Sequence, residues 1–227
     1  ARSRKCGTGW RRTASRRTWC KRQRSRRPPS LGRRLCQKGR GRRQLFEETP
    51  TVSLDLIKAL SVPKDSLIDV GGGASRLAAH ALRLGFGHVA VLDLSAEATA
   101  RSQAAMGSEA DRVEWIVDDV TTWKPGRQYD VWHDRAAFHF LTDKADRAAY
   151  VETLDAALSD TGHAIIATFA LDGPQRCSGL PVQRYSPETL VETLGPRFRL
   201  VNGLRHEHQT PSGSMQAFQF SVLERTA

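Results

Sequence analysis

Three aspartates and two glycines have the types and the spacing to bind a nucleoside. Gly71 and Gly73 lie in the run GGG, directly after an apolar segment that contains Asp69. Glycines there let the backbone turn sharply and approach a ligand where a Cβ would clash. Asp93 and Asp119 each follow a later apolar segment. A carboxylate in such a place can accept hydrogen bonds from ribose hydroxyls or from the amine of an adenine.

The elements around the glycines must place them at the end of a buried strand. Residues 67–70 form a short apolar run without alternation, as in a parallel strand covered on both faces. Residues 77–84 have the apolar stripe of a helix, and 88–92 form the next strand, with Asp93 at its carboxyl end. A strand, glycine turn, helix and acid-ended strand are how doubly wound folds hold a nucleoside. A tight turn that binds no ligand is the alternative.

The class of nucleoside depends on one missing glycine. The dinucleotide fingerprint G-x-G-x-x-G requires a third glycine three residues after Gly73, and this chain has Arg76 there. A nicotinamide or flavin dinucleotide is therefore disfavoured, and an NAD-type oxidoreductase remains as an alternative function.

The rest of the chain from about residue 44 alternates helices and strands. The predicted elements are a helix capped by Thr51 and running through Leu60, a helix over 96–106 capped by Ser95, strands at 113–117, 129–133 and 163–169, a helix from Thr142 to about Gly162, a helix that starts at Ser186, and two final strands at 198–206 and 215–223. The final pair predicts an antiparallel hairpin. The expected fold is α/β: a three-layer αβα sandwich around a mostly parallel seven-stranded sheet with an antiparallel C-terminal hairpin.

Polar residues gather after the predicted strand 129–133. His133, Asp134 and Arg135 lie at its carboxyl end, which faces the ligand crevice of an open parallel sheet, and His139 follows closely. Either histidine could serve as a general base, or be a packed and hydrogen-bonded spacer beside aromatic residues. Arg135 could bind an acidic acceptor or pair with Asp134.

The pair Asp118-Asp119 also has two interpretations. Asp119 could accept from the exocyclic amine of an adenine while the backbone N–H of Val120 donates to the ring. The pair could instead form a solvated turn or a helix cap with Thr121 and Thr122.

Charge is very unevenly distributed. Residues 1–43 hold 18 of the 35 Lys and Arg and none of the 24 Asp and Glu, and they lack Val, Ile, Phe and Tyr. Such a segment cannot bury enough apolar surface to offset its ordering entropy, so we expect a disordered tail at 1–43 and one domain at 44–227. The tail could be a frame-shifted or fragmentary sequence, a nucleic-acid-binding arm, a solvated charge run, or in composition a mitochondrial presequence.

Several classes of protein are disfavoured. Three of the four cysteines, Cys6, Cys20 and Cys36, lie far apart in the tail without a zinc-like spacing, and Cys177 stands alone. We expect no metal site. No apolar run approaches the roughly 18 residues needed to span a bilayer, so we expect a cytoplasmic protein, a monomer without membrane contact.

The joint pattern resembles the class I, seven-stranded S-adenosylmethionine-dependent methyltransferases over about residues 50–225. The resemblance rests on the alternating strands and helices, the glycine turn, the acids at consecutive strand ends and the terminal hairpin. The segments WHDRAAFHFL and FEETPTVSLDLI resemble a group of small bacterial methyltransferases that includes lysine methyltransferases. Members usually have an aromatic-containing segment over the cofactor before the first core helix, where this chain has its arginine-rich tail with Leu45 and Phe46.

This resemblance implies a role for each residue named above. S-adenosyl-L-methionine would be the cofactor, bound by Asp69, Gly71, Gly73, Asp93, Asp119, Val120 and the backbone of His133. The acceptor would lie near Asp134 and Arg135, with His139 or His133 as the base if one is used. The acceptor stays open between a protein lysine and a small molecule. A third hypothesis is a non-catalytic protein that binds nucleic acid through the tail.

Overall fold

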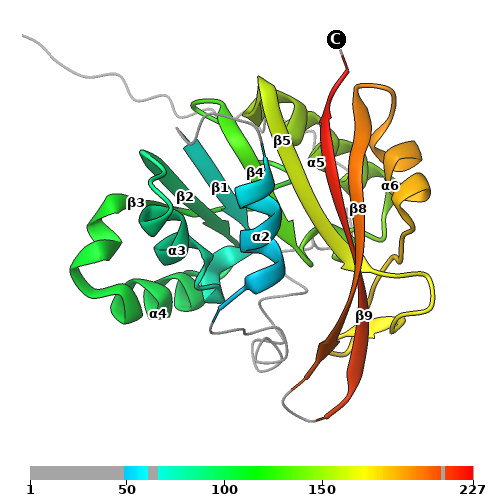
Figure 1. Cartoon of the computed structure of the whole chain (residues 1–227), viewed down its shortest axis with the longest axis horizontal. Coiled ribbons are helices and arrows are strands. Elements are labelled where there is room, and N and C mark those ends of the chain that lie inside the picture. Colours follow the sequence, from blue (N-terminus) through cyan, green and yellow to red (C-terminus); the bar gives the residue numbers. More distant parts are fainter. Residues whose placement is uncertain (1–48, 61–65, 211–212, 227) are drawn as a thin grey trace, which may run out of the picture.

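The chain folds around one seven-stranded sheet in the computed structural model, which describes residues 49–60, 66–210 and 213–226. The strand order is β3-β2-β1-β4-β5-β9-β8 (Figure 1). The pairs among β1 to β5 are parallel, whereas β9 is antiparallel to both β5 and β8. The predicted α/β fold with a C-terminal hairpin is confirmed. The predicted tail, with its three cysteines, lies outside the described residues.

The sheet strands are β1 (Ser66–Val70), β2 (His88–Asp93), β3 (Val113–Val117), β4 (Tyr129–Arg135), β5 (Leu158–Phe169), β8 (Phe198–Gln209) and β9 (Met215–Arg225). The α-helices are α2 (Thr51–Ala59), α3 (Leu77–Arg83), α4 (Ala96–Met106), α5 (Lys144–Ala157) and α6 (Pro187–Leu194). Short 3₁₀ helices are η2 (Gly72–Ala74), η3 (Gly107–Arg112) and η4 (Phe138–Phe140), and a small hairpin joins β6 (Arg176–Cys177) to β7 (Leu180–Pro181). None of the helices in the described residues is long and apolar enough to cross a membrane.

Successive residues of the central strands point to opposite faces of the sheet. On β1, Leu67 belongs to the apolar cluster that includes residues of α2 and α3, and Ile68 to the cluster that includes residues of α5 and α6. Val131 and Trp132 of β4 divide in the same way. Asp69 and His133, which pair across β1 and β4, therefore face α2, and Asp134 faces α5.

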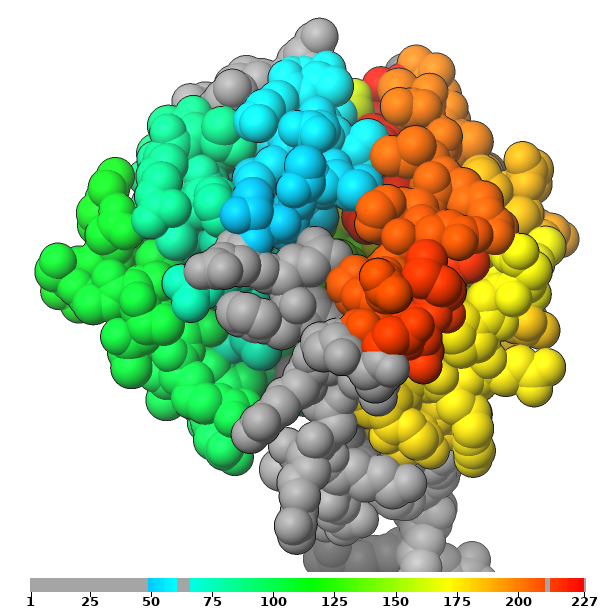
Figure 2. Space-filling view, turned by 60° about the horizontal axis from the view of Figure 1, so that its bottom comes forward, coloured from blue at the N-terminus to red at the C-terminus, as the bar shows by residue number. Residues whose placement is uncertain are grey.

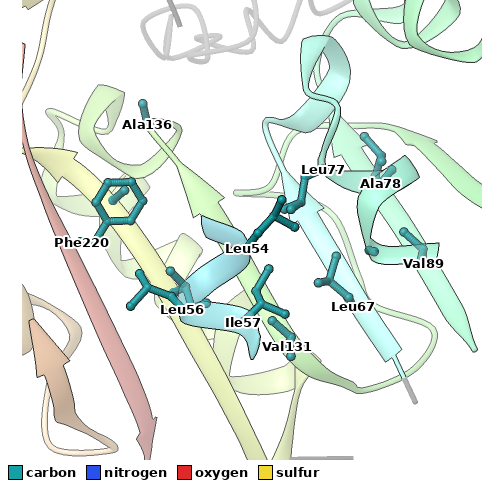
Figure 3. Close-up of a cluster of buried hydrophobic side chains, with 14 of the residues drawn as sticks. Leu54, Leu56, Ile57, Leu67, Leu77, Ala78, Val89, Val131, Ala136 and Phe220 are labelled. Atoms are coloured by element: carbon teal, nitrogen blue, oxygen red, sulfur yellow. The ribbon is translucent and has the colours of Figure 1, made fainter. Parts of the chain in front are cut away.

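Helix α2 is held against the sheet by its apolar side chains. Figure 3 shows Ile57 of α2 beside Val131 on β4 and Leu54 of α2 beside Leu77 of α3, and these residues belong to one buried cluster. In Figure 2 the same helix, in cyan, covers the middle of this face between the green β2–β3 half and the orange hairpin.

Some boundaries differ from the predicted ones. Thr51 is the first residue of α2 rather than its cap, and its hydroxyl donates to the Thr49 carbonyl. Helix α5 is capped by Asp143, which accepts from the Ala145 N–H, and it ends at Ala157. The segment from Leu158 through Gly162, which was predicted as helix, is the first part of strand β5.

Candidate functional site

A cavity opens at the carboxyl ends of β1, β2 and β4, where the sequence places its candidate residues. Its lining includes Asp69, Gly71, Gly72, Asp93, Asp118, Val120, His133, Arg135, Phe140, Cys177, Ser178 and Leu180. Gly73, Asp119, Asp134 and His139 were also predicted for the site, but they lie outside this lining.

The glycine turn makes room for two carboxylates. Gly71 has φ +73°, and its N–H donates to the Leu92 carbonyl at 2.7 Å. A Cβ on Gly72 would lie 2.2 Å from Oδ2 of Asp69, and a Cβ on Gly73 would lie 2.7 Å from Cγ of Asp93. Gly73 therefore acts on the site through Asp93, and Gly72 is a residue that the sequence analysis missed.

Asp93 is held at the cavity by two backbone donors. Its Oδ1 accepts from the Ser95 N–H at 2.7 Å, and its Oδ2 accepts from the Gly73 N–H at 2.9 Å. Each carboxylate oxygen has a second lone pair, so this buried side chain can still accept from hydroxyl groups of a ligand.

Asp69 lines the cavity, and its two carboxylate oxygens differ in their contacts. Its Oδ1 lies 2.7 Å from Nδ1 of His133, while its buried Oδ2 has no hydrogen-bond partner among the described residues. A buried carboxylate oxygen without a partner is costly, so its position in the lining indicates a cationic or hydrogen-bond-donating ligand.

The side chain of His133 has both ring nitrogens engaged. Nε2 lies 2.9 Å from Oγ of Ser53 on α2, and Nδ1 is bound to Asp69. This arrangement argues against the general base proposed for His133, although the residue does line the cavity.

Asp134 lies on the face of the sheet that α5 covers, and it is not among the residues that line the cavity. Its carboxylate accepts from the N–H groups of Ala137 and Phe138 and from the Tyr150 hydroxyl. Burial raises the pKa of Asp134 to about 6, although the bonds from Tyr150 and Ala137 act in the other direction. These contacts argue against the predicted substrate-binding role for Asp134, because strand alternation turns the side chain toward α5.

His139 is also unsuited to its predicted role. Its side chain is 0 % exposed, its ring contacts those of Phe140 and Phe169, and neither ring nitrogen has a partner among the described residues. Burial lowers the pKa of His139 to about 3, which keeps the imidazole neutral. These contacts argue against His139 as a general base and fit a packed spacer, although the hydrogen bonds expected of that spacer are missing among the described residues.

Of the two adjacent aspartates, Asp118 lines the cavity and Asp119 does not. Asp119 accepts instead from the N–H and the hydroxyl of Thr121, at 3.0 and 2.7 Å through Oδ1, which matches the turn-or-cap alternative. Val120 does line the cavity. The side-chain contacts of Asp119 thus do not support its predicted role as an acceptor for the adenine amine.

The small hairpin β6–β7 closes one end of the cavity with Cys177, Ser178 and Leu180. Ser178, at φ +50°, and Ala136, at φ +69°, are non-glycine residues with left-handed backbone, and both contribute to the lining. Such conformations are strained and tend to occur at functional sites. The Gly- and Pro-bounded loop was visible in the sequence, but no local signal shows that it folds back onto the cavity.

The charge of the lining distinguishes between cofactors. The acidic and basic side chains that line the cavity are Asp69, Asp93, Asp118 and Arg135. Three carboxylates against one guanidinium favour a cationic ligand and would repel the pyrophosphate of a dinucleotide. Within the described residues, no group of His, Cys, Asp or Glu is arranged to hold a metal ion.

A comparison with protein families identifies this arrangement. Residues 67–162 match the family model described as a methyltransferase domain, and this segment includes the glycine turn, Asp93 and Asp118. Residues 67–162 therefore form a methyltransferase domain, and the chain has the fold of the class I S-adenosylmethionine-dependent methyltransferases. The resemblance seen in the sequence is confirmed, and with it S-adenosylmethionine as the cofactor of this methyltransferase.

Solved structures have the same fold as this methyltransferase. The 1,6-didemethyltoxoflavin-N1-methyltransferase of Burkholderia thailandensis, solved with S-adenosylhomocysteine, has a TM-score of 0.64 at 22 % identity over 78 % of each chain. A methyltransferase from Clostridium acetobutylicum has 0.61 at 11 %, over 78 % of this chain and 89 % of its own. The glycopeptide N-methyltransferase MtfA has 0.60 at 14 %, over 80 % and 96 %. No curated protein sequence matches this chain significantly.

Proposed function

We propose that this methyltransferase binds its cofactor in the cavity through Asp93 and Asp69 and transfers the methyl group to a small molecule. The observation that carries the proposal is the pair of buried carboxylates at the ends of adjacent strands. Asp93 would accept from the ribose hydroxyls, and the unpartnered Oδ2 of Asp69 would accept from the ammonium group of the methionyl part. Val120 and Asp118 are nearest to the place expected for the adenine.

When bound, S-adenosylmethionine supplies a methyl group on a positively charged sulfur, which a lone pair of the acceptor can displace in line. The protein's contribution is then alignment and the exclusion of water. The buried residues of β1, β2 and β4 supply a rigid wall for this purpose.

The class of acceptor is argued from the other end of the cavity. That end is lined by Arg135, Ala136, Ala137, Phe140 and the hairpin residues Cys177, Ser178 and Leu180, without a carboxylate. Most of these side chains are apolar, and a lysine ammonium is costly to bury against them, so a neutral small molecule is favoured over a protein lysine. The name of the Burkholderia relative also gives it a small-molecule substrate.

Isothermal titration of the full chain with S-adenosylmethionine and with NAD tests the cofactor site. We expect binding of S-adenosylmethionine only, weakened about 10- to 100-fold in Asp93→Ala because a charged hydrogen-bond acceptor is removed. Asp130→Ala is the matched control, since Asp130 is a carboxylate on β4 that binds Ser66 and Ser159 outside the cavity lining. Equal affinity in Asp93→Ala and Asp130→Ala would remove Asp93 from the site.

Incubation with cofactor carrying a labelled methyl group, against metabolite fractions and lysate proteins, tests the acceptor. We expect label in a small molecule. Label on protein lysine would overturn the acceptor class and leave the cofactor site intact.

A further inference from the structure

A buried hydrogen-bonded chain crosses from helix α2 to the cavity. Ser53 Oγ lies 2.9 Å from Nε2 of His133, and Nδ1 of the same ring lies 2.7 Å from Oδ1 of Asp69. The three side chains are 1 %, 2 % and 2 % exposed. They come from α2, β4 and β1, so the chain connects three elements that are distant in sequence.

The donors and acceptors of this chain can be satisfied in one consistent way. The ionised carboxylate of Asp69 only accepts, so Nδ1 of His133 must carry the hydrogen that it donates. In the neutral ring Nε2 then accepts, and the Ser53 hydroxyl donates to it. This assignment uses both ring nitrogens and Oδ1, and it leaves Oδ2 of Asp69 as the one oxygen for a ligand in the cavity.

Ser53 is unusual in its surroundings. It is one of the buried residues of α2, together with Leu54, Leu56 and Ile57. Packing alone would favour an apolar residue there, because a buried hydroxyl is destabilising unless it is hydrogen-bonded. The hydrogen bond of the Ser53 hydroxyl with His133 therefore accounts for its presence.

Rotation of the Asp69 carboxylate would change the shape of the cavity. A Cβ at Gly72 would lie 2.2 Å from Oδ2 and 2.5 Å from Cγ, so the carboxylate lies directly against the glycine turn. The bond from His133 to Oδ1 fixes the orientation of this carboxylate.

We infer that Ser53 and His133 are positioning residues, which orient the Asp69 carboxylate for the amino-acid part of the cofactor and make α2 a structural part of the cofactor site. The inference rests on the proposed binding of S-adenosylmethionine. In this inference His133 is a hydrogen-bond bridge and not a general base. Variants of the two residues should therefore lose affinity only for ligands that contain the amino-acid part.

The test compares two ligands by isothermal titration with the full chain. S-adenosylhomocysteine has the amino-acid part, whereas 5′-methylthioadenosine lacks it. Ser53→Ala is expected to lower the affinity for S-adenosylhomocysteine about fivefold. The affinity for 5′-methylthioadenosine should stay within about twofold of the wild-type value. Ser66→Ala is the control, because Ser66 is an equally buried serine that bonds to a carboxylate, Asp130, outside the cavity lining, and it should change neither ligand.

Two substitutions of His133 provide a second measurement that does not depend on Ser53→Ala folding. His133→Asn keeps an N–H donor near the place of Nδ1, so it should lose no more than Ser53→Ala. His133→Ala removes the donor, and a loss of about 20-fold or more for S-adenosylhomocysteine is expected.

The outcomes separate the inference from the proposed function. If the wild type binds neither ligand, the proposed cofactor site fails and the inference fails with it. If both ligands bind but Ser53→Ala matches Ser66→Ala, or weakens both ligands equally, the positioning role is wrong and the cofactor site stands. Equal losses in His133→Asn and His133→Ala would also contradict the bridge.

Discussion

At the scale of single residues, burial determines what His139 can do. Its ring lies against Phe140 and Phe169, and its pKa is lowered to about 3 by the loss of solvent. An imidazole that remains neutral above that pH, without a partner among the described residues, contributes packing volume and little else.

We predict that His139→Leu keeps cofactor binding and the free energy of unfolding at pH 8, or raises the latter, because two unpartnered buried nitrogens are removed. Since the folded pKa lies below the unfolded value of 6.5, the unfolded state binds the proton more tightly, and His139 lowers stability as the pH falls from 6.5 toward 3. Wild type should thus lose about 2 kcal/mol more than the variant between pH 8 and pH 5.

Urea denaturation at the two pH values measures this difference. If the variant folds and binds the cofactor but no longer transfers the methyl group, His139 has a catalytic role and the prediction is wrong.

At the scale of elements, the end of β4 is tied to α5 by a second buried chain. The Trp132 Nε1–H donates to the Tyr150 hydroxyl at 2.9 Å, and that hydroxyl donates to Oδ2 of Asp134 at 2.7 Å. Asp134 in turn accepts from the first N–H groups of the turn that leads to η4. These bonds hold the backbone that places Arg135 and Phe140 in the cavity wall.

We predict that Tyr150→Phe lowers the free energy of unfolding by about 2 kcal/mol at pH 8, because it leaves a buried carboxylate and an indole N–H without their partner. The loss should be smaller at pH 5. The pKa of Asp134 is raised to about 6, so below that pH the carboxyl is largely protonated and its need for a donor weakens.

Urea denaturation of wild type and variant at both pH values provides the measurement. Tyr129→Phe is the control, since its hydroxyl makes only a 3.5 Å contact with the half-exposed Glu114. A loss for Tyr150→Phe that is the same at both pH values would contradict the role of Asp134.

At the scale of the whole molecule, the sheet and both apolar clusters lie within residues 49–226. The hairpin β8–β9 completes the sheet, and its Phe218, Phe220 and Val222 extend the cluster beneath α2. We propose, from the composition of residues 1–43, that this basic segment is separate from the folding unit.

We predict that a chain of residues 44–227 unfolds within about 2 °C of the full chain and binds S-adenosylmethionine equally well, because residues 1–43 lack the Val, Ile, Phe and Tyr side chains that could pack into a core. Calorimetric melting and titration measure both. Salt-sensitive binding of RNA or DNA, if present in the full chain, should disappear with the tail. A large fall in melting temperature would place part of the tail in the fold.

The sequence by itself determined the elements and their order, because the signals are local. The glycine turn, the Ser95 cap with its bond from the Ala98 N–H, and the capping box of Ser186 act over a few residues, and all are present in the structure. The alternation of strands and helices then predicted the α/β sheet and the carboxyl edge at which Asp69 and Asp93 meet.

Only the tertiary structure decided which side chains share the cavity. His133 and Asp134 are neighbours in sequence, yet strand alternation turns one toward α2 and the other toward α5. Ser53, Asp118 and the β6–β7 hairpin join the site through packing across elements that are distant in the chain. Such contacts depend on sheet order and on helix placement, for which a local pattern of residues has no signal.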